Sequence, residues 1–178
     1  DIVYHLAAGG VEPGKISDKE ILEVNVKGTF RLMEFLDKIE VGKIIYAGSC
    51  FEYGMGEDID EATLPVMDTV YAASKTTAWH LIRSYALARG TTALMLRPFT
   101  VYGPFEEDYR LIPYTIKSAI RGGPIQVTAG KQTRDFVYID DMTEACLAAG
   151  QKNVLDGVIF NVCTGCQTSV DTVVEKVI

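Results

Sequence analysis

Two periods of hydrophobicity alternate along the chain, one typical of strands and one typical of helices. Short apolar runs predict strands at about residues 1–8, 43–48, 91–97 and 158–162, with shorter strands near Ile125 and Phe136. Apolar residues at helical spacing predict helices at about 17–39, 69–88, 111–121, 170–178 and from 140 onward. Ser17 and Glu20 have the spacing of a capping box. The alternation predicts an α/β fold, a doubly wound parallel sheet whose ligand lies beyond the carboxyl ends of its strands.

Composition and charge narrow the classes of partner. The chain has 178 residues, of which 48% are hydrophobic and 23% charged, as in an ordinary globular protein. Its net charge of −7 opposes a nucleic-acid partner, because such proteins neutralise phosphates with basic surfaces. We find neither an apolar run of roughly 20 residues nor a signal pattern, so we expect a cytoplasmic protein without membrane contact.

Four cysteines raise the question of a metal or redox site. Cys163 and Cys166 form a CxxC, which suits redox chemistry or half a zinc site. The chain has no second CxxC, and its two histidines, His5 and His80, are remote in sequence. We therefore expect free thiols and no metal.

The strongest candidate for chemistry is the YxxxK segment at 71–75. Residues four apart share one face of a helix, so the Tyr71 phenol and the Lys75 ammonium can face one site. A phenol titrates near 10 in water, and an adjacent cation stabilises the phenolate and makes the group useful as an acid/base near neutral pH. Ser49 follows a predicted strand, where its hydroxyl could bind the same substrate oxygen. A surface tyrosine beside a solvated lysine is the alternative.

At this point the chain resembles the extended short-chain dehydrogenases, the NAD-dependent family that includes nucleotide-sugar epimerases, dehydratases and 4-ketoreductases. The resemblance rests on six ordered segments: HLAA at 5–8, NVKGT at 25–29, GSCFEYG at 48–54, YAASK at 71–75, RPFTVYGP at 97–104 and RDFVYIDD at 134–141. It implies a Rossmann-like fold, NAD or NADP as cofactor, a substrate sugar linked to a nucleoside diphosphate (an NDP-sugar), and a homodimer formed through the helices at about 17–39 and 69–89.

The resemblance also implies roles for individual residues. Tyr71 would be the acid/base, Lys75 would lower its pKa and hold the nicotinamide ribose, and Ser49 would orient the sugar hydroxyl or ketone. Cofactor contacts would come from Leu6, Ala7, Ala8, Asn25, Tyr71, Lys75, Pro98 and Phe99, with helix packing as the alternative for Asn25. Substrate contacts would come from Ser49, Cys50, Thr100 and Arg134. The Arg134 guanidinium suits a diphosphate, and a surface salt bridge with Asp135 is the alternative.

The chain departs from the family pattern at its ends. No glycine-rich turn precedes the first predicted strand, and the sequence stops inside a predicted helix. We therefore expect a fragment of the full enzyme, a Rossmann-like sheet lacking its N-terminal glycine-rich βαβ unit. Residues 1–178 would form a single unit, with a cofactor-binding part at about 1–104 and 136–163. Substrate-binding segments at about 105–135 and 164–178 would be interleaved with it.

Differences near Ser49 bear on the type of reaction. Dehydratases of the family carry an Asp-Glu pair where this chain has Cys50 and Phe51, so 4,6-dehydration is disfavoured. Glu52 would point elsewhere if the backbone stays extended. Glu52 and Thr100 also replace residues that are common in epimerases. We expect hydride transfer at C4 of an NDP-sugar by an epimerase or a 4-ketoreductase. A non-catalytic nucleotide-binding or regulatory protein with the same fold is the alternative.

Overall fold

The chain forms two compact units in the computed structural model, which describes residues 1–12, 14–127, 130–153 and 155–178. The first unit comprises Asp1–Pro98 and Glu144–Asn161, and the second comprises Phe99–Thr143 and Val162–Ile178. The assignment of a cofactor part and substrate segments to the chain stays a prediction.

A four-stranded sheet forms the centre of the first unit. Its strands are β1 (Ile2–His5), β2 (Lys43–Ala47), β3 (Thr92–Pro98) and β6 (Ile159–Val162), and they lie in the order β1-β2-β3-β6. The pairs β1/β2 and β2/β3 are both parallel, so their carboxyl ends meet at one edge of the sheet. This edge carries Leu6, Ser49 and Pro98, which follow or end these three strands.

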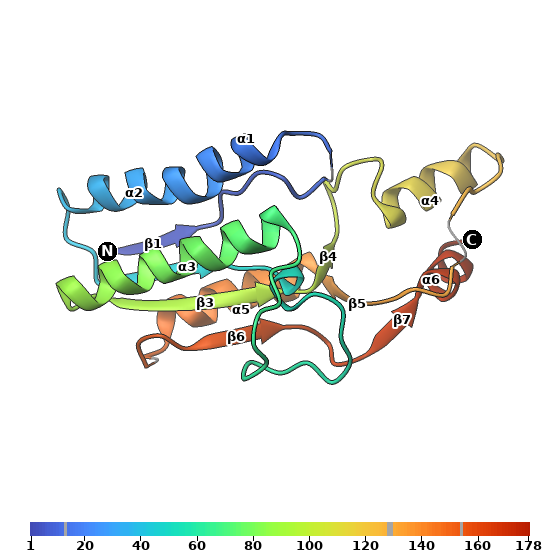
Figure 1. Ribbon diagram of the computed structural model, residues 1–178. Coiled ribbons are helices and arrows are strands. Elements are labelled where there is room, and N and C mark those ends of the chain that lie inside the picture. The colour runs from blue at the N-terminus through green and yellow to red at the C-terminus, as the bar shows by residue number, and fades with distance from the viewer. Residues whose placement is uncertain (13, 128–129, 154) are drawn as a thin grey trace. The chain divides into compact units, whose positions relative to one another are not determined.

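Helices cover both faces of this sheet (Figure 1). On one face, α1 (Asp18–Leu22), a π-helical turn η1 (Glu23–Lys27) and α2 (Gly28–Leu36) form one continuous helical stretch beside α3 (Val70–Arg89). On the other face lies α5 (Ile139–Gln151), and the Lys43 ammonium of β2 donates to the carbonyls of Ala149 and Gly150 at 3.0 and 2.9 Å. The predicted doubly wound α/β fold is confirmed.

Local sequence signals explain where the helices begin and end. The predicted capping box is present, because Glu20 N donates to the Ser17 hydroxyl and Ser17 N donates to the Glu20 carboxylate. Thr69 accepts from Ala72 N and caps α3, which ends at Gly90 with a left-handed φ of 65°. The predicted helices at 17–39 and 69–88 thus match the structure closely.

The core of the first unit lies between α2, α3 and the sheet. Alternate residues of β2 and β3, including Ile44, Tyr46 and Met95, point toward α3 and pack on Trp79 and Ile82. All five side chains are at most 4% exposed. This packing fixes α3 against β2, which sets the position of the YxxxK segment.

The second unit contains a three-stranded sheet and two further helices. The sheet has the order β4-β5-β7, with β4 (Thr100–Tyr102), β5 (Thr133–Tyr138) and β7 (Gln167–Ser169). The helices are α4 (Leu111–Ile120) and α6 (Val170–Val177). Neither β4 nor β7 was predicted, since each has only three residues.

The predicted strand near Ile125 is wrong for the described residues, because 123–127 lie outside any helix or strand. Gly122 has a φ of 66°, and Pro124 has no backbone N–H to give to a sheet. Two apolar residues, Ile125 and Val127, with a glutamine between them are too few to establish a ladder after such a turn.

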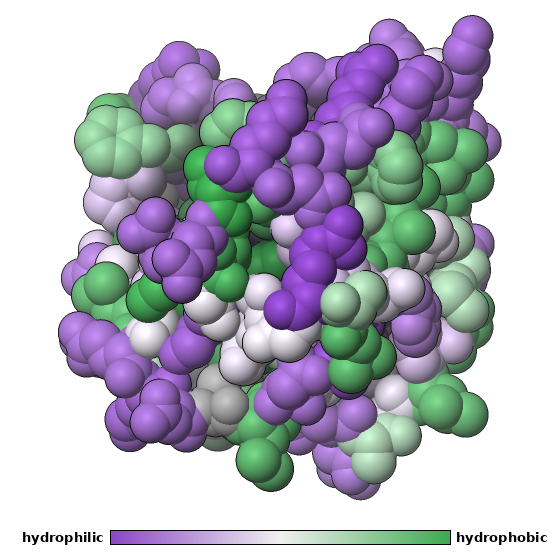
Figure 2. All heavy atoms as spheres, turned by 90° about the vertical axis from the view of Figure 1, so that its left-hand side faces the viewer, coloured by the Kyte–Doolittle hydropathy of each residue, from purple (hydrophilic) through white to green (hydrophobic). Residues whose placement is uncertain are grey.

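The surface carries hydrophilic and apolar residues side by side, as on the face drawn in Figure 2. None of the described helices is long and apolar enough to cross a membrane. The four cysteines, all in the described part of the chain, form no disulfide, and no group of three potential metal ligands occurs among the described residues.

Candidate active site

Ser49 lies where β2 ends and the chain turns into a short 3₁₀ helix, η2 (Cys50–Tyr53). Its backbone is extended, with φ −159° and ψ 142°, and its hydroxyl accepts a hydrogen bond from Phe51 N at 3.3 Å. The Glu52 carboxylate accepts in turn from Ser49 N at 2.8 Å. Ser49 is therefore the N-cap of a second capping box, one that is buried rather than exposed.

Tyr71 and Lys75 lie one turn apart at the start of α3. Tyr71 is half-buried, and its ring meets the Phe51 ring edge-on with 6.2 Å between the centroids. This contact joins α3 to η2, the turn that Ser49 caps. The three predicted catalytic residues thus come from two segments of the same unit that touch each other.

Lys75 is only 2% exposed, which is unusual for an ammonium group. Its Nζ lies over the Tyr46 ring, 4.5 Å from the centroid, and the Tyr46 hydroxyl donates to the Lys75 carbonyl at 3.1 Å. Burial lowers the pKa of Lys75 to about 8, and the Glu52 carboxylate opposes this shift. Lys75 therefore keeps its charge at neutral pH, but holds its proton far less firmly than a surface lysine.

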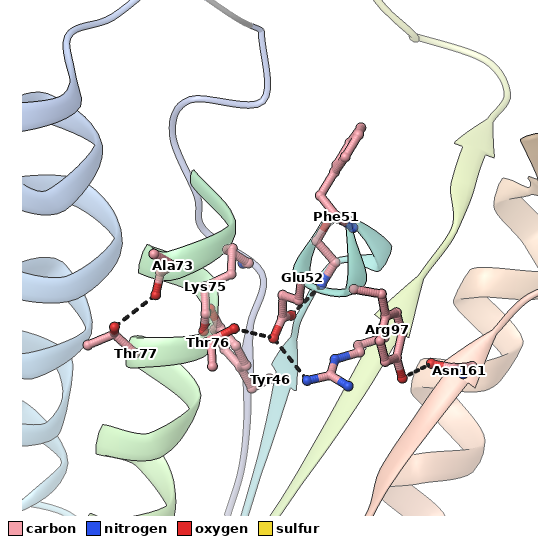
Figure 3. Close-up of polar contacts among 11 residues, drawn as sticks. Tyr46, Phe51, Glu52, Ala73, Lys75, Thr76, Thr77, Arg97 and Asn161 are labelled. Atoms are coloured by element: carbon pink, nitrogen blue, oxygen red, sulfur yellow. Dashed lines mark hydrogen bonds and ion pairs between the residues drawn. The ribbon is translucent and has the colours of Figure 1, made fainter. Parts of the chain in front are cut away.

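Glu52 is completely buried at the centre of a polar cluster (Figure 3). Its Oε2 accepts from the Thr76 hydroxyl and from Arg97 Nη2, both at 3.0 Å. Arg97 is 2% exposed, and its guanidinium also lies 4.5 Å from the Tyr53 ring centroid. The carboxylate thus links the end of β2, the residue after Lys75 and the end of β3.

This arrangement corrects the expected direction of Glu52. The backbone does not stay extended after Ser49, because it turns into η2 and brings Glu52 back toward Ser49 N. A capping-box spacing, Ser49-x-x-Glu52, was visible in the sequence, as it was at Ser17 and Glu20. Sequence reasoning missed Glu52 as a member of the site because it did not apply that pattern a second time.

His5 is a further buried group near Lys75. Its Nε2 lies 2.8 Å from the Thr29 hydroxyl, which itself donates to the Asn25 carbonyl at 2.6 Å. Thr29 therefore accepts from His5 Nε2–H. Burial and the nearby Lys75 charge lower the pKa of His5 to about 4. His5 is therefore neutral at pH 7, beside the charged Lys75.

Asn25 connects the loop after β1 to α3. Its amide accepts from Gly9 N at 2.7 Å, and it donates to the Gly9 carbonyl and to the Ser74 hydroxyl at 2.9 Å each. Ser74 directly precedes Lys75, so Asn25 holds α3 beside the loop. The loop residues Leu6, Ala7 and Ala8 are exposed at the carboxyl end of β1. They remain predicted cofactor contacts.

The remaining predicted residues are more dispersed. Cys50 lies in η2 and Pro98 ends β3, both in the first unit. Phe99, Thr100 and Arg134 belong to the second unit.

The predicted alternative for Arg134, a salt bridge with Asp135, does not match the observed contacts. Asp135 accepts hydrogen bonds from Thr164 N and Gly165 N, and Arg134 donates to the Thr133 carbonyl at 3.2 Å. Arg134 is exposed, so its guanidinium is accessible to an anionic ligand.

Together these groups provide what proton transfer at a carbinol or ketone needs. The site has a phenol, a buried ammonium one turn away and a hydroxyl on an adjoining turn. They lie at the edge of a parallel sheet where α/β proteins bind their ligands.

Comparison with known proteins identifies the family of this chain. Residues 1–163 match the model of the NAD dependent epimerase/dehydratase family. The chain belongs to this family. The predicted resemblance is therefore confirmed.

Relatives within the epimerase/dehydratase family differ in their reactions. UDP-N-acetyl-alpha-D-glucosaminuronate decarboxylase of Bacillus cytotoxicus is 34% identical over 99% of this chain and 58% of its own length. The human dTDP-D-glucose 4,6-dehydratase is 31% identical over 100% of this chain and 52% of its own length. The chain thus spans little more than half the length of these relatives, and its likeness to a dehydratase does not support excluding dehydration.

A solved structure resembles the whole fold of this family member. The UDP-glucuronic acid 4-epimerase of Bacillus cereus, in complex with UDP-glucuronic acid and NAD, has a TM-score of 0.90 and 30% identity. The similarity covers 99% of this chain and 58% of the epimerase.

Proposed function

We propose that this chain carries the catalytic centre of an NAD(P)-dependent enzyme that transfers a hydride at C4 of an NDP-sugar. The observation that supports this most is the buried Lys75 ammonium one helical turn from Tyr71, beside the turn capped by Ser49. Membership of the epimerase/dehydratase family agrees with the reaction class. Both a 4-epimerase and a 4-ketoreductase would use this centre.

In the proposed mechanism Tyr71 exchanges a proton with the sugar oxygen at C4. The Lys75 ammonium stabilises the phenolate of Tyr71, and its burial strengthens this interaction because water does not screen it. The Ser49 hydroxyl binds the same sugar oxygen and orients it. The cofactor, when bound, supplies or accepts the hydride at the carbon.

The residues at the sheet edge fit a dinucleotide. Leu6, Ala7 and Ala8 expose a stretch of small or apolar chain after β1, at the carboxyl edge where doubly wound sheets bind nucleotides. The Asn25 bonds to Gly9 and Ser74 hold this loop against η1 and α3. We propose that the loop lies along the cofactor, with Pro98 near the nicotinamide, and that Arg134 binds the substrate diphosphate.

We favour C4 chemistry without dehydration because of the residues that follow Ser49. Cys50 and Phe51 carry no carboxyl group, and the Glu52 carboxylate is occupied by Ser49 N, Thr76 and Arg97. Elimination of water needs an acid for the leaving hydroxyl and a base for the carbon-bound proton. Neither Cys50 nor Phe51 can provide them.

The test is a product analysis of the complete polypeptide that contains this chain, supplied with UDP- and dTDP-linked sugars that carry a 4-hydroxyl or a 4-keto group. Net oxidation of NADH or NADPH with a keto-sugar would identify a reductase. Inversion at C4 without net change in the cofactor would identify an epimerase. A 4-keto-6-deoxy product would contradict the proposal in favour of dehydration, and cofactor binding without any turnover would support the non-catalytic alternative.

A homodimer through the helical layer remains part of the proposal. Phe30 and Phe35 of α2 and Leu87 of α3 are 51%, 55% and 65% exposed, which leaves apolar surface on both helices. Light scattering on the complete polypeptide tests this, and a clean monomer would refute it.

A further inference from the structure

The Glu52 carboxylate accepts hydrogen bonds in a position that suits neither an apolar side chain nor an amide. Three donors converge on its two oxygens: Ser49 N on Oε1, and the Thr76 hydroxyl and Arg97 Nη2 on Oε2. A Cβ at Gly48 would come within 2.7 Å of Oε1, so the glycine leaves space for this approach. The carboxylate and the guanidinium are buried almost completely.

The donors explain why the group must be an acceptor at both oxygens. A backbone N–H and a guanidinium can only donate, whereas a hydroxyl can donate or accept. An amide in place of Glu52 would put its NH₂ group against either Ser49 N–H or Arg97. The pattern therefore requires an ionised carboxylate as long as Arg97 is present.

We propose that Glu52 is a positioning residue for the reaction, which fixes the backbone of Ser49 relative to the Lys75–Thr76 turn of α3. This inference rests on the proposed function, since it assigns Glu52 a part in the same site. Glu52 touches neither substrate nor cofactor in this role. The Glu52 carboxylate acts by binding both segments that carry the reacting side chains, the turn at Ser49 and the first turns of α3.

The charge of Glu52 also affects the site, because it acts on Lys75. The Glu52 carboxylate opposes the effect of burial on Lys75. Among the described residues, His5 from β1 and Tyr46 from β2 also lie near Lys75, and Tyr71 lies one turn before it on α3. Arg97 from β3 is the counter-charge of Glu52. A test of positioning must therefore separate the hydrogen bond to Ser49 from the charge near Lys75.

Two double variants make that separation in the complete polypeptide. In E52Q/R97M the amide oxygen can accept from Ser49 N while its NH₂ donates to the Thr76 hydroxyl, so the bond to Ser49 survives. In E52L/R97M that acceptor is lost. Both variants lack the Glu52–Arg97 pair, so neither leaves one member of that pair buried alone. Both also remove the carboxylate near Lys75, so a difference between the two variants does not arise from charge. The matched control is E20Q, which alters the exposed capping box at Ser17.

We expect kcat of E52L/R97M to fall about 10- to 100-fold below that of E52Q/R97M, because small displacements of a reacting group have effects of this size. Affinities for NDP-sugar and cofactor should agree within about 3-fold, which a general loss of structure would not allow. The Ser49 amide should exchange with solvent at least about 10-fold faster in the leucine variant. E20Q should match the wild type in kcat.

Equal kcat values and equal Ser49 exchange in the two double variants would overturn the positioning role while leaving the proposed function intact. If the wild type turns over no NDP-sugar, the proposed function fails. The exchange of the Ser49 amide then decides alone whether Glu52 holds Ser49 in place.

Discussion

Replacing Lys75 by methionine should make the protein more stable and inactive. Lys75 is 2% exposed, and burial lowers its pKa from 10.5 to about 8. A displacement of this size corresponds to about 3 kcal/mol of unfolding free energy lost by keeping the ammonium charged at neutral pH. Methionine has a similar length and no charge. The variant should therefore gain roughly 2 to 3 kcal/mol at pH 7 and lose the cation that supports Tyr71.

The difference in unfolding free energy between the wild type and Lys75→Met should depend on pH. The folded pKa of Lys75 lies below the unfolded one, so the unfolded chain binds more protons between pH 8 and 10.5. Wild-type stability should rise relative to the variant across that window. The difference between the two proteins should narrow from about 3 kcal/mol at pH 7 to about 1 kcal/mol at pH 9.5.

Urea unfolding of wild type and Lys75→Met at pH 7, 8 and 9.5 measures this difference directly. Lys19→Met is the matched control, because Lys19 is exposed on α1, and its effect should stay within about 0.5 kcal/mol at every pH. A Lys75→Met protein less stable than wild type at pH 7, or a gap that does not narrow, would refute the account of Lys75 as a buried ammonium.

Two further predictions concern the polar contacts that support α3. Asn25→Ala removes three hydrogen bonds to Gly9 and Ser74 and should lower the unfolding free energy by about 3 kcal/mol in urea; a loss below about 1 kcal/mol would contradict the bracing role. His5 has a folded pKa of about 4 against 6.5 ordinarily, so the wild type should lose about 2 kcal/mol between pH 7 and 4.5 as the unfolded chain takes up a proton. His5→Gln keeps a donor for Thr29 and should remove that part of the slope; an unchanged slope would contradict it.

The fold was predictable because each long element has a strong local signal. Ser17 and Glu20 marked the start of the first helix, and Pro98 marked the end of β3. Strands of three residues such as β4 and β7 lack the length for a recognisable period. The strand predicted near Ile125 rested on only two apolar residues, Ile125 and Val127, and Gly122 and Pro124 precede it.

The site was predictable only in the part that a short motif encodes. Tyr71 and Lys75 stand four residues apart, and a helix is enough to bring them together. The Glu52–Arg97 pair joins residues 45 apart in sequence, and it depends on the packing of η2 against β3. The burial of Lys75 likewise follows from tertiary packing on Tyr46, which spacing alone does not contain.

The most direct test of the proposed chemistry is turnover by Tyr71→Phe in the complete polypeptide, measured together with NAD(H) and NADP(H) affinity. Phenylalanine keeps the edge-on contact with Phe51 and removes only the hydroxyl. We predict that kcat falls by a factor of about 10² to 10⁴ while cofactor affinity changes less than about 3-fold. A variant that keeps kcat within about 3-fold of the wild type would contradict the assignment of Tyr71 as the acid/base.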